Sequence, residues 1–253
     1  MVDEQTDDAR VRTALLRGIR RGTWEVGTRL PSESELCATL DANRGQLRRV
    51  LAGLRADGIV AGGRGRPPVV RSTVPVRAFE TFVPFSRWAE SIGQVPGQRT
   101  LEVVRRPAQE GEARMLGIAV ETPVVAVTRV RSLDDRPAML ERSCFPVESG
   151  RTLLHADLDQ GSVHDRLIAA GVRLVTARHL IDAVAASGLE AETLGVETGS
   201  PILRERRVVR DDRGVAVEFA DERYRPEAAR FSIEHPVLAL GREAASASPT
   251  MDA

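Results

Sequence analysis

Two helix-start signals in the first part of the chain restrict its fold more than any other feature. Ser32 is a good N-cap, and Glu35, three residues later, completes a capping box that predicts a helix from this point. Asn43 and Gln46 form a second pair of the same kind. Two capped helices separated by a short break at residues 41–43 indicate a helix–turn–helix.

The flanking segments complete a small domain. Apolar residues at helical spacing predict a first helix over residues 8–21, and a further apolar stripe follows residues 47–54. Two short strands, residues 59–60 and 69–70, enclose a glycine-rich turn at residues 62–67. Three helices followed by a hairpin predict a winged helix–turn–helix.

Charge is distributed unevenly along a chain whose net charge is zero. The 36 basic residues are all arginine, and 36 acidic residues balance them. Residues 10–71 carry 13 arginines and five acids, a local excess of +8, whereas residues 1–9 carry four acids and no base. A cationic block of this kind is typical of nucleic-acid-binding domains. The third helix is therefore expected to enter the major groove by its N-terminal end.

The same block resembles a known family. The run Gly27–Leu36, which reads GTRLPSESEL, and the glycine-rich wing at residues 63–65 resemble the DNA-binding domain of the GntR family of bacterial transcription regulators. This resemblance implies that the DNA-contacting residues are Arg44, Gln46, Arg48, Arg64 and Gly65.

A different architecture is predicted after residue 78. Segments rich in Val, Ile and Leu predict strands, and two shorter segments with caps or glycine stops predict helices. The strands are expected at residues 101–104, 124–130, 139–145, 174–186, 202–210 and 215–224, and the helices at residues 110–116 and 162–170. An antiparallel sheet flanked by a few helices makes the whole chain α+β.

This second part also resembles a family domain. Short motifs in a common order, among them Thr128–Arg131, Gly161–Leu167 and Tyr224-Arg225, resemble the UTRA effector-binding domain of the HutC subfamily of GntR regulators. The resemblance implies a chorismate-lyase-like antiparallel sheet. The predicted organisation is a winged helix–turn–helix domain (residues 8–71), a linker (72–78), a UTRA-like effector domain (79–240) and a disordered tail (241–253).

Two arginines on one predicted strand suggest what the second domain binds. Arg129 and Arg131 are two residues apart, so their guanidinium groups share a face. Neighbouring guanidiniums repel unless an anion lies between them, which favours a phosphate or carboxylate ligand. In a second interpretation, one of them forms a structural ion pair with Glu141. The family resemblance implies that the effector contacts Ser86, Arg129, Arg131, Glu141, Ser162, Glu218 and Tyr224.

The predicted function is that of a transcription regulator, and the family resemblance implies a repressor. A homodimer would bind double-stranded operator DNA, and a small anionic metabolite, such as a phosphorylated sugar, would control that affinity from the C-terminal domain. The alternative is an enzyme of chorismate-lyase-like fold acting on a small carboxylate. An enzyme would not need the cationic N-terminal domain, so no enzymatic activity is expected.

Other kinds of site have little support in the sequence. Cys37 and Cys144 lie far apart, and the histidines have no metal-ligand spacing, so neither a metal nor another cofactor is expected. His164 stands at a helix start and is expected to lie at the surface. No apolar run approaches the ~20 residues that span a bilayer, and the acidic N-terminus is unlike a signal peptide. We therefore expect a cytoplasmic protein without membrane contact.

Overall fold

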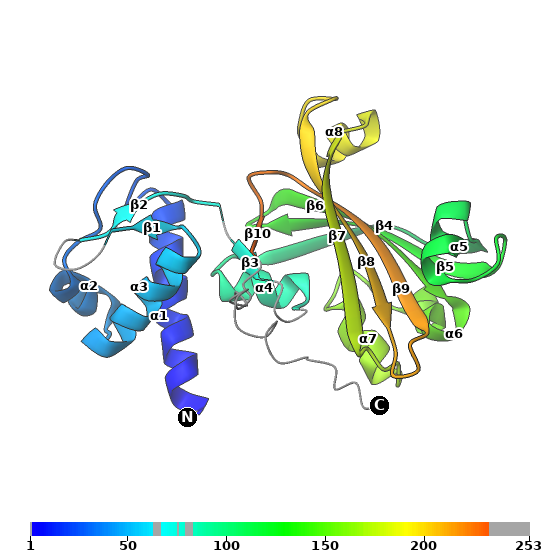
Figure 1. Cartoon of the computed structure of the whole chain (residues 1–253), viewed down its shortest axis with the longest axis horizontal. Coiled ribbons are helices and arrows are strands. Elements are labelled where there is room, and N and C mark those ends of the chain that lie inside the picture. The colour runs from blue at the N-terminus through cyan, green and yellow to red at the C-terminus, as the bar shows by residue number, and fades with distance from the viewer. Residues whose placement is uncertain (1, 63–66, 75, 79–82, 233–253) are drawn as a thin grey trace, which may run out of the picture.

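An N-terminal helical unit and a C-terminal sheet unit lie side by side in the computed structural model, which describes residues 2–62, 67–74, 76–78 and 83–232 (Figure 1). The N-terminal unit has the winged helix–turn–helix order that the sequence predicts. Its elements are α1 (Val2–Arg20), α2 (Glu33–Leu40), α3 (Arg44–Ala56), β1 (Val60–Ala61) and β2 (Val69–Val70).

Both predicted capping boxes are present. The Ser32 hydroxyl accepts from the Glu35 N–H, and the Glu35 carboxylate accepts from the Ser32 N–H at 2.8 Å. Asn43 and Gln46 exchange the equivalent two bonds, each at 2.9 Å. Asp41 takes a left-handed conformation with φ of 48° at the end of α2, which allows the chain to turn into α3 within a few residues. The turn therefore follows from local sequence chemistry.

The first helix is longer than the periodicity predicts, because it begins at Val2 rather than near residue 8. Apolar spacing becomes visible only where α1 reaches the core, at Val11 and Leu15. Four of the residues before that point are acidic, and acidic side chains are favourable at the positive end of a helix. This part of the sequence has no apolar spacing from which a helix could be predicted.

Six antiparallel strands form the C-terminal sheet in the order β4-β5-β6-β9-β8-β7. The strands are β4 (Pro96–Pro107), β5 (Pro123–Leu133), β6 (Arg136–Pro146), β7 (Thr176–Ala185), β8 (Pro201–Arg210) and β9 (Ala216–Tyr224). The flanking helices are α4 (Phe85–Ser91), α5 (Glu110–Leu116), α6 (Val147–Gly150), the 3-10 helix η1 (Arg151–His155), α7 (Val163–Ala169) and α8 (Gly188–Leu194). The α+β prediction is confirmed, while α4, α6, η1 and α8 are helices that the sequence reasoning missed.

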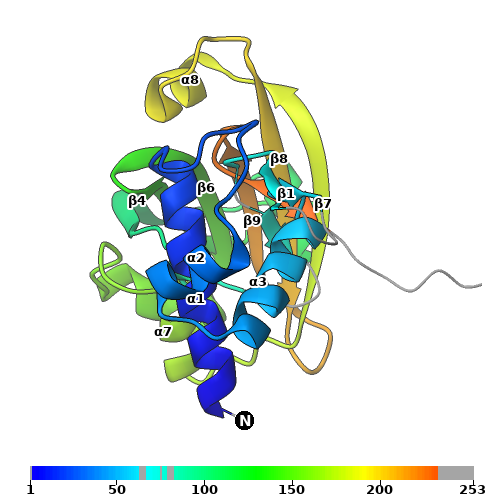
Figure 2. The same cartoon turned by 90° about the vertical axis from the view of Figure 1, so that its left-hand side faces the viewer.

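Both faces of the central strands are covered, so their side chains alternate between two cores. Val125 and Val127 of β5 pack with Leu167 of α7 on one face. Val124 and Val130 of the same strand belong to apolar clusters with α5 and α8 on the other face. Figure 2 shows α8 and α7 at opposite ends of the sheet, behind the N-terminal unit. A side chain on the first of these faces is therefore enclosed under helices.

The two units share one buried core. Trp88, Ala89 and Ile92, in and just after α4, pack in the same cluster as Leu15 and Leu16 of α1. In Figure 1, α4 lies between the N-terminal unit and the sheet. Because packed cores do not deform freely, a displacement of α4 also shifts the residues of both units that pack against it.

The segment expected as a linker contains a strand. β3 (Val76–Ala78) pairs in parallel with β10 (Arg230–Ser232) as a separate two-stranded sheet. So short a strand leaves no periodicity to read, and its partner comes from the far end of the sheet unit. The predicted tail at residues 241–253 lies outside the described residues. None of the helices in the described part of the chain is long and apolar enough to cross a membrane.

Candidate functional site

The N-terminal end of α3 presents two arginines to solvent. Arg44 and Arg48 are both exposed, and each is joined to α2 by one side-chain contact. Arg44 donates to the Ser34 hydroxyl at 3.3 Å, and Nε of Arg48 donates to the Glu33 carboxylate at 3.0 Å. Exposed ion pairs of this kind contribute little to stability. Both guanidinium groups therefore remain available to another partner.

Gln46 differs from these two neighbours because it is buried. Its amide oxygen completes the cap of α3, and its amide nitrogen donates to the carboxylate of Asp7. The predicted contact between Gln46 and DNA stays a prediction, but the structure gives this side chain a structural task. Arg64 and Gly65 of the predicted wing contact lie outside the described residues.

Acidic residues of α1 touch the exposed side of α3, which the sequence reasoning did not foresee. Asp8 accepts two hydrogen bonds from Arg49, at 2.8 and 3.0 Å. Arg10 caps the end of α2 by donating to the carbonyl oxygens of Leu40 and Asp41. The acidic head of the chain thus screens part of the positive charge next to Arg44 and Arg48.

In the C-terminal unit, charged residues form a row across the strands. The strand register places Arg129 of β5 opposite Glu141 of β6, Glu141 opposite Glu222 of β9, and Glu222 opposite Glu205 of β8. Directly opposed residues of antiparallel strands share a face, and all four side chains are buried. The row therefore lies within one core and contains three neighbouring carboxylates.

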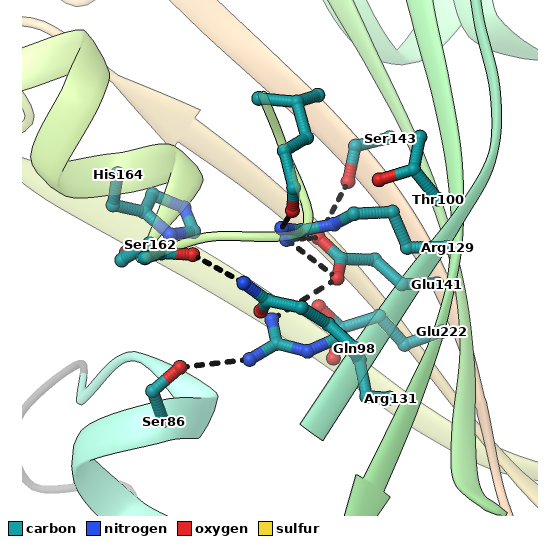
Figure 3. A network of polar contacts seen from close by, with 12 residues as sticks. Ser86, Gln98, Thr100, Arg129, Arg131, Glu141, Ser143, Ser162, His164 and Glu222 are labelled. Atoms are coloured by element: carbon teal, nitrogen blue, oxygen red, sulfur yellow. Dashed lines mark hydrogen bonds and ion pairs between the residues drawn. The ribbon is translucent and has the colours of Figure 1, made fainter. Parts of the chain in front are cut away.

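Arginines offset these carboxylates. Nη2 of Arg129 donates to both oxygens of Glu141, at 2.9 and 2.8 Å, and Arg131 approaches the same carboxylate at 3.4 Å. Figure 3 shows the two guanidinium groups converging on Glu141. The ion pair of the second sequence interpretation is therefore present, with Glu141 as the anion between the two arginines. The phosphate or carboxylate ligand of the first interpretation stays a prediction.

Arg207 of β8 holds the other acids. Its Nη1 lies 2.7 Å from Glu222 and 3.7 Å from Glu205, and its Nη2 donates to Glu218 at 2.9 Å. Glu218 also contacts Nε2 of His164 at 2.8 Å. The expectation that His164 lies at the surface is wrong, since it is 7% exposed. Its ring turns from the start of α7 towards the sheet, where a buried carboxylate needs a partner.

The electrostatics of Glu141 follow from this enclosure. Burial alone would raise the pKa of its carboxyl group, but the guanidinium groups of Arg129 and Arg131 lower the pKa to about 2. The pKa of Glu218 is likewise raised by burial and lowered more strongly by His164 and Arg207. Both carboxylates are therefore charged at neutral pH.

We expect folding stability to fall as the pH drops from about 5 to about 2. The pKa of Glu141 is lower in the folded protein than its ordinary 4.5. The ionised carboxylate therefore stabilises the fold at pH values above its ordinary pKa. Its contribution to the free energy of unfolding, on the order of 3 kcal/mol, is lost as the carboxylate is protonated at lower pH. Urea unfolding as a function of pH should show a shallower dependence for Glu141→Gln than for the unaltered chain. Identical dependences would contradict this assignment.

The two serines of the predicted site come from the starts of two helices, α4 and α7. The Ser86 hydroxyl of α4 accepts from Nη2 of Arg131 at 2.8 Å, and the Phe85 ring lies 4.6 Å from the Arg131 guanidinium carbon. Ser162 caps α7 by accepting from the Asp165 N–H. Figure 3 shows Ser86 and Ser162 facing the network from these two helices.

A small cavity, about 10 Å³, lies in the middle of this network. Among the predicted ligand residues, it is lined by Ser86, Arg129, Arg131, Glu141 and Ser162. Two of its lining residues have buried atoms with no hydrogen-bond partner among the described residues, namely Nε of Arg129 and Nε of Arg131. The buried hydroxyl of Thr100, on β4 opposite Arg129, is likewise without one. The space is that of about one water molecule, so a larger ligand requires the surrounding side chains to move.

The other two predicted ligand residues, Glu218 and Tyr224, are not among the residues that line this cavity. Tyr224 is fully buried, donates to Glu222 at 2.6 Å and stacks edge-on with Phe231 at 5.3 Å. Glu218 contacts Arg207 and His164, which line the cavity themselves. Sequence reasoning missed these two residues and Glu222. The two-residue spacing of Glu205 and Arg207, and the four-residue spacing of Glu218 and Glu222, were available signals that they share a face.

Comparison with known proteins yields two domain matches. Residues 8–70 match the bacterial regulatory proteins of the gntR family, and residues 91–230 match the UTRA domain. The chain is 27% identical over 218 residues to the HTH-type transcriptional repressor NagR of Bacillus subtilis, covering 86% of this chain and 88% of that protein. It is also 27% identical over 219 residues to a probable fructoselysine utilization operon transcriptional repressor of Escherichia coli, covering 84% and 88% respectively.

Solved structures share the fold. The crystal structure of PhnF from Mycobacterium smegmatis matches with a TM-score of 0.65 at 24% identity, covering 89% of this chain and 99% of that chain. A possible transcriptional regulator, YydK from Bacillus subtilis, matches with a TM-score of 0.56 at 18% identity and covers 91% and 99%. These likenesses extend over both units, so the whole two-unit arrangement occurs in other proteins.

Proposed function

The chain belongs to the GntR family of bacterial regulators and carries a UTRA domain, and we propose that it is a repressor controlled by a small anion. It binds operator DNA as a homodimer through the exposed end of α3. The anion, most simply the phosphate of a phosphorylated sugar, binds at the Arg129–Arg131 pair and changes the affinity for DNA. The observation that carries this proposal is the carboxylate of Glu141 held between two buried guanidinium groups.

An anionic ligand can compete with Glu141 for the same donors. A phosphate offers several acceptor oxygens and a higher charge than a carboxylate, which suits bidentate arginine. The donors that Glu141 leaves unused, Nε of Arg129 and Nε of Arg131, add to this preference. The hydroxyl groups of Ser86 and Ser162 line the same cavity and provide neutral partners for sugar hydroxyls.

At the N-terminal unit, Arg44 and Arg48 supply the DNA contacts. Arginine at the start of a helix in the major groove can donate two hydrogen bonds to a guanine edge. A homodimer brings two such helices to the two halves of a palindromic site. The exposed hydrogen bonds from Arg44 to Ser34 and from Arg48 to Glu33 contribute little free energy, so contacts with DNA can replace them readily.

The helix α4 provides a route between the two sites. Its first residues, Phe85 and Ser86, contact Arg131, while Trp88 packs in the core shared with α1. The Phe85 and Trp88 rings also stack edge-on at 5.5 Å. A ligand that draws Arg131 away from Ser86 changes how α4 packs on the sheet. Because α4 shares a core with α1, the positions of α1 and α3 change with it. Linkage requires that bound DNA lowers the affinity for the ligand by the same factor by which the bound ligand lowers the affinity for DNA.

The decisive experiment measures both sites on the full chain. A labelled duplex from the DNA upstream of its own gene is titrated by fluorescence anisotropy, with and without members of a panel of sugar phosphates and small carboxylates. Thermal shift on the same panel reports binding independently, because a bound ligand raises the melting temperature. A sugar phosphate that raises the melting temperature and weakens DNA binding supports the proposal. If no panel member does both, the proposed effector class is wrong.

The variant Arg131→Gln separates ligand binding from DNA binding. Arg131 holds Glu141 less closely than Arg129 does, so its loss leaves the main buried ion pair in place. We expect the thermal shift by the active sugar phosphate to disappear, while the affinity of the ligand-free protein for DNA changes less than about threefold. A full ligand-induced shift in this variant would exclude Arg131 from the site.

The variant Ser86→Ala tests the route through α4. Removing this acceptor deletes the hydrogen bond between α4 and Arg131 and leaves the Phe85 ring beside the guanidinium group, so the ligand should change DNA affinity at least about threefold less than in the unaltered chain. Ser91→Ala on the same helix is the matched control, because its hydroxyl donates to the Trp88 carbonyl and has no bond to Arg131. Equal responses of both variants in the anisotropy titration would contradict the proposed route.

A further inference from the structure

A second cavity lies at the junction of the two units and is far larger than the one beside Glu141. Its volume is about 610 Å³, within the range typical of small-molecule sites. Its walls come from the end of α1, from residues 93–95 after α4, from the β5–β6 turn and from residues 225–228 after β9. We call it the junction cleft. Because both units contribute walls, a ligand in it would contact both.

The junction cleft is strongly cationic. Its lining contains five arginines and only two acids, Asp134 and Glu227. The arginines are Arg17, Arg20, Arg21, Arg136 and Arg225. Cations in the last turn of a helix are favourable by themselves, which accounts for Arg17 and Arg20 of α1. It does not account for Arg136 and Arg225, which reach the cleft from the sheet unit.

Three of these five arginines have no direct partner in the described part of the chain. The side chains of Arg17, Arg21 and Arg136 are exposed and make no hydrogen bond or ion pair with the described residues. Arg20 donates one bond to the Ile92 carbonyl oxygen, while its buried Nη1 has no partner in the described part of the chain. Burial accordingly lowers the pKa of Arg20.

The two acids of the cleft offset only part of the charge of its five arginines. Asp134 accepts from the Val95 N–H at 2.9 Å and from the Gln94 amide at 3.0 Å. Against the effect of burial, its pKa is lowered by these bonds and by the charges of Arg20 and Arg21. Glu227 lies 3.7 Å from Arg225, and its side chain is 69% exposed. The lining residues include no aromatic ring. Recognition here therefore depends on charge and hydrogen bonding rather than on stacking against a base.

We propose that the junction cleft is a second binding site, separate from the Arg129–Arg131 site, for a compact small molecule carrying two or more phosphate groups. Several guanidinium groups around one concave space match such a polyanion, because each phosphate can accept paired bonds from arginine. Binding joins α1 to the sheet unit and holds the two units in one relative placement. The binding does not depend on the proposed repressor function; only its consequence for DNA affinity does.

Calorimetry on the full chain with inorganic pyrophosphate tests the site directly. We expect saturable binding, with one ligand per chain, that the triple variant Arg17→Gln/Arg21→Gln/Arg136→Gln weakens at least about tenfold. The matched control, Arg105→Gln/Arg114→Gln/Arg213→Gln, removes the same charge from exposed positions outside the cleft and should weaken binding less than about threefold. Equal weakening by both variants would mean non-specific charge attraction and overturn the proposal, as would the absence of saturable binding.

Glu227→Gln provides a test of opposite sign. Removing this negative charge frees Arg225 and should tighten pyrophosphate binding about two- to fivefold. A structural role of the cleft alone would not produce this change, so unchanged or weaker binding counts against the site.

The alternative ligand for the arginines of the cleft is the phosphate backbone of DNA. In that case the triple variant would lose DNA affinity while no variant altered pyrophosphate binding, and the small-molecule proposal would fail.

Discussion

Replacing Arg207 with methionine should lower the free energy of unfolding by about 3–5 kcal/mol, because it leaves buried carboxylates without their shared cation. Arg207 is 1% exposed and contacts Glu205, Glu218 and Glu222. The three acids hold the pKa of Arg207 above its ordinary value in spite of its burial. The melting temperature should fall by roughly 10 °C, as measured by circular dichroism or calorimetry.

Arg206→Met is the matched control for this effect. Arg206 is the neighbouring residue on β8 and points to the other face of the sheet. Within the described residues its ion pair is with Asp182, at 3.4 Å. Its replacement should cost less than about 1 kcal/mol. If the two variants lose similar stability, the charged row is not the structural centre of the C-terminal unit.

The double variant Arg44→Ala/Arg48→Ala should weaken binding to the operator by roughly 2–6 kcal/mol, or from about 30-fold to more than a thousandfold. Both side chains are exposed at the start of α3 and have only weak contacts to α2, so stability should hardly change. Anisotropy titration against the operator duplex and a scrambled duplex measures the loss. A preferential loss on the operator indicates base contacts.

Salt dependence separates base contacts from phosphate contacts in this variant. Each lost phosphate contact lowers the slope of log affinity against log salt by about one, whereas a lost base contact leaves the slope unchanged. Arg114→Ala/Arg213→Ala removes the same charge from exposed positions of the C-terminal unit. If this control binds DNA as weakly as the α3 variant, total charge rather than the α3 surface governs the affinity.

Much of the fold was predictable because its signals are local. The capping boxes at Ser32 and Asn43 determine where α2 and α3 begin, and both are present. The hairpin between β8 and β9 has its turn at Asp211–Gly214, between the two strands predicted at residues 202–210 and 215–224. Short elements without such signals were missed. β3 exists only because β10, distant in the sequence, pairs with it, and α4 is held by packing rather than by a side-chain cap.

Only the part of the candidate site that lies on β5, together with its partner Glu141, could be predicted from the sequence. The spacing of Arg129 and Arg131 places both on one face, and Glu141 is their partner across β5 and β6. The roles of Arg207, His164 and Glu222 depend on which strands become neighbours, and the strand order was not available from spacing. The same holds for Gln46, whose burial reflects the position of Asp7 on another helix.

Three features can be read from residues close together along the chain: the cationic N-terminal block, the helix starts within it, and the alternation that puts two arginines on one side of a strand. Local backbone geometry brings such residues together. Three others exist only in the folded chain: Glu141 fills the space between the arginines, α4 joins this site to α1, and arginines of both units surround the junction cleft. Those contacts join segments that are distant along the chain, so they arise only when packing selects which elements meet.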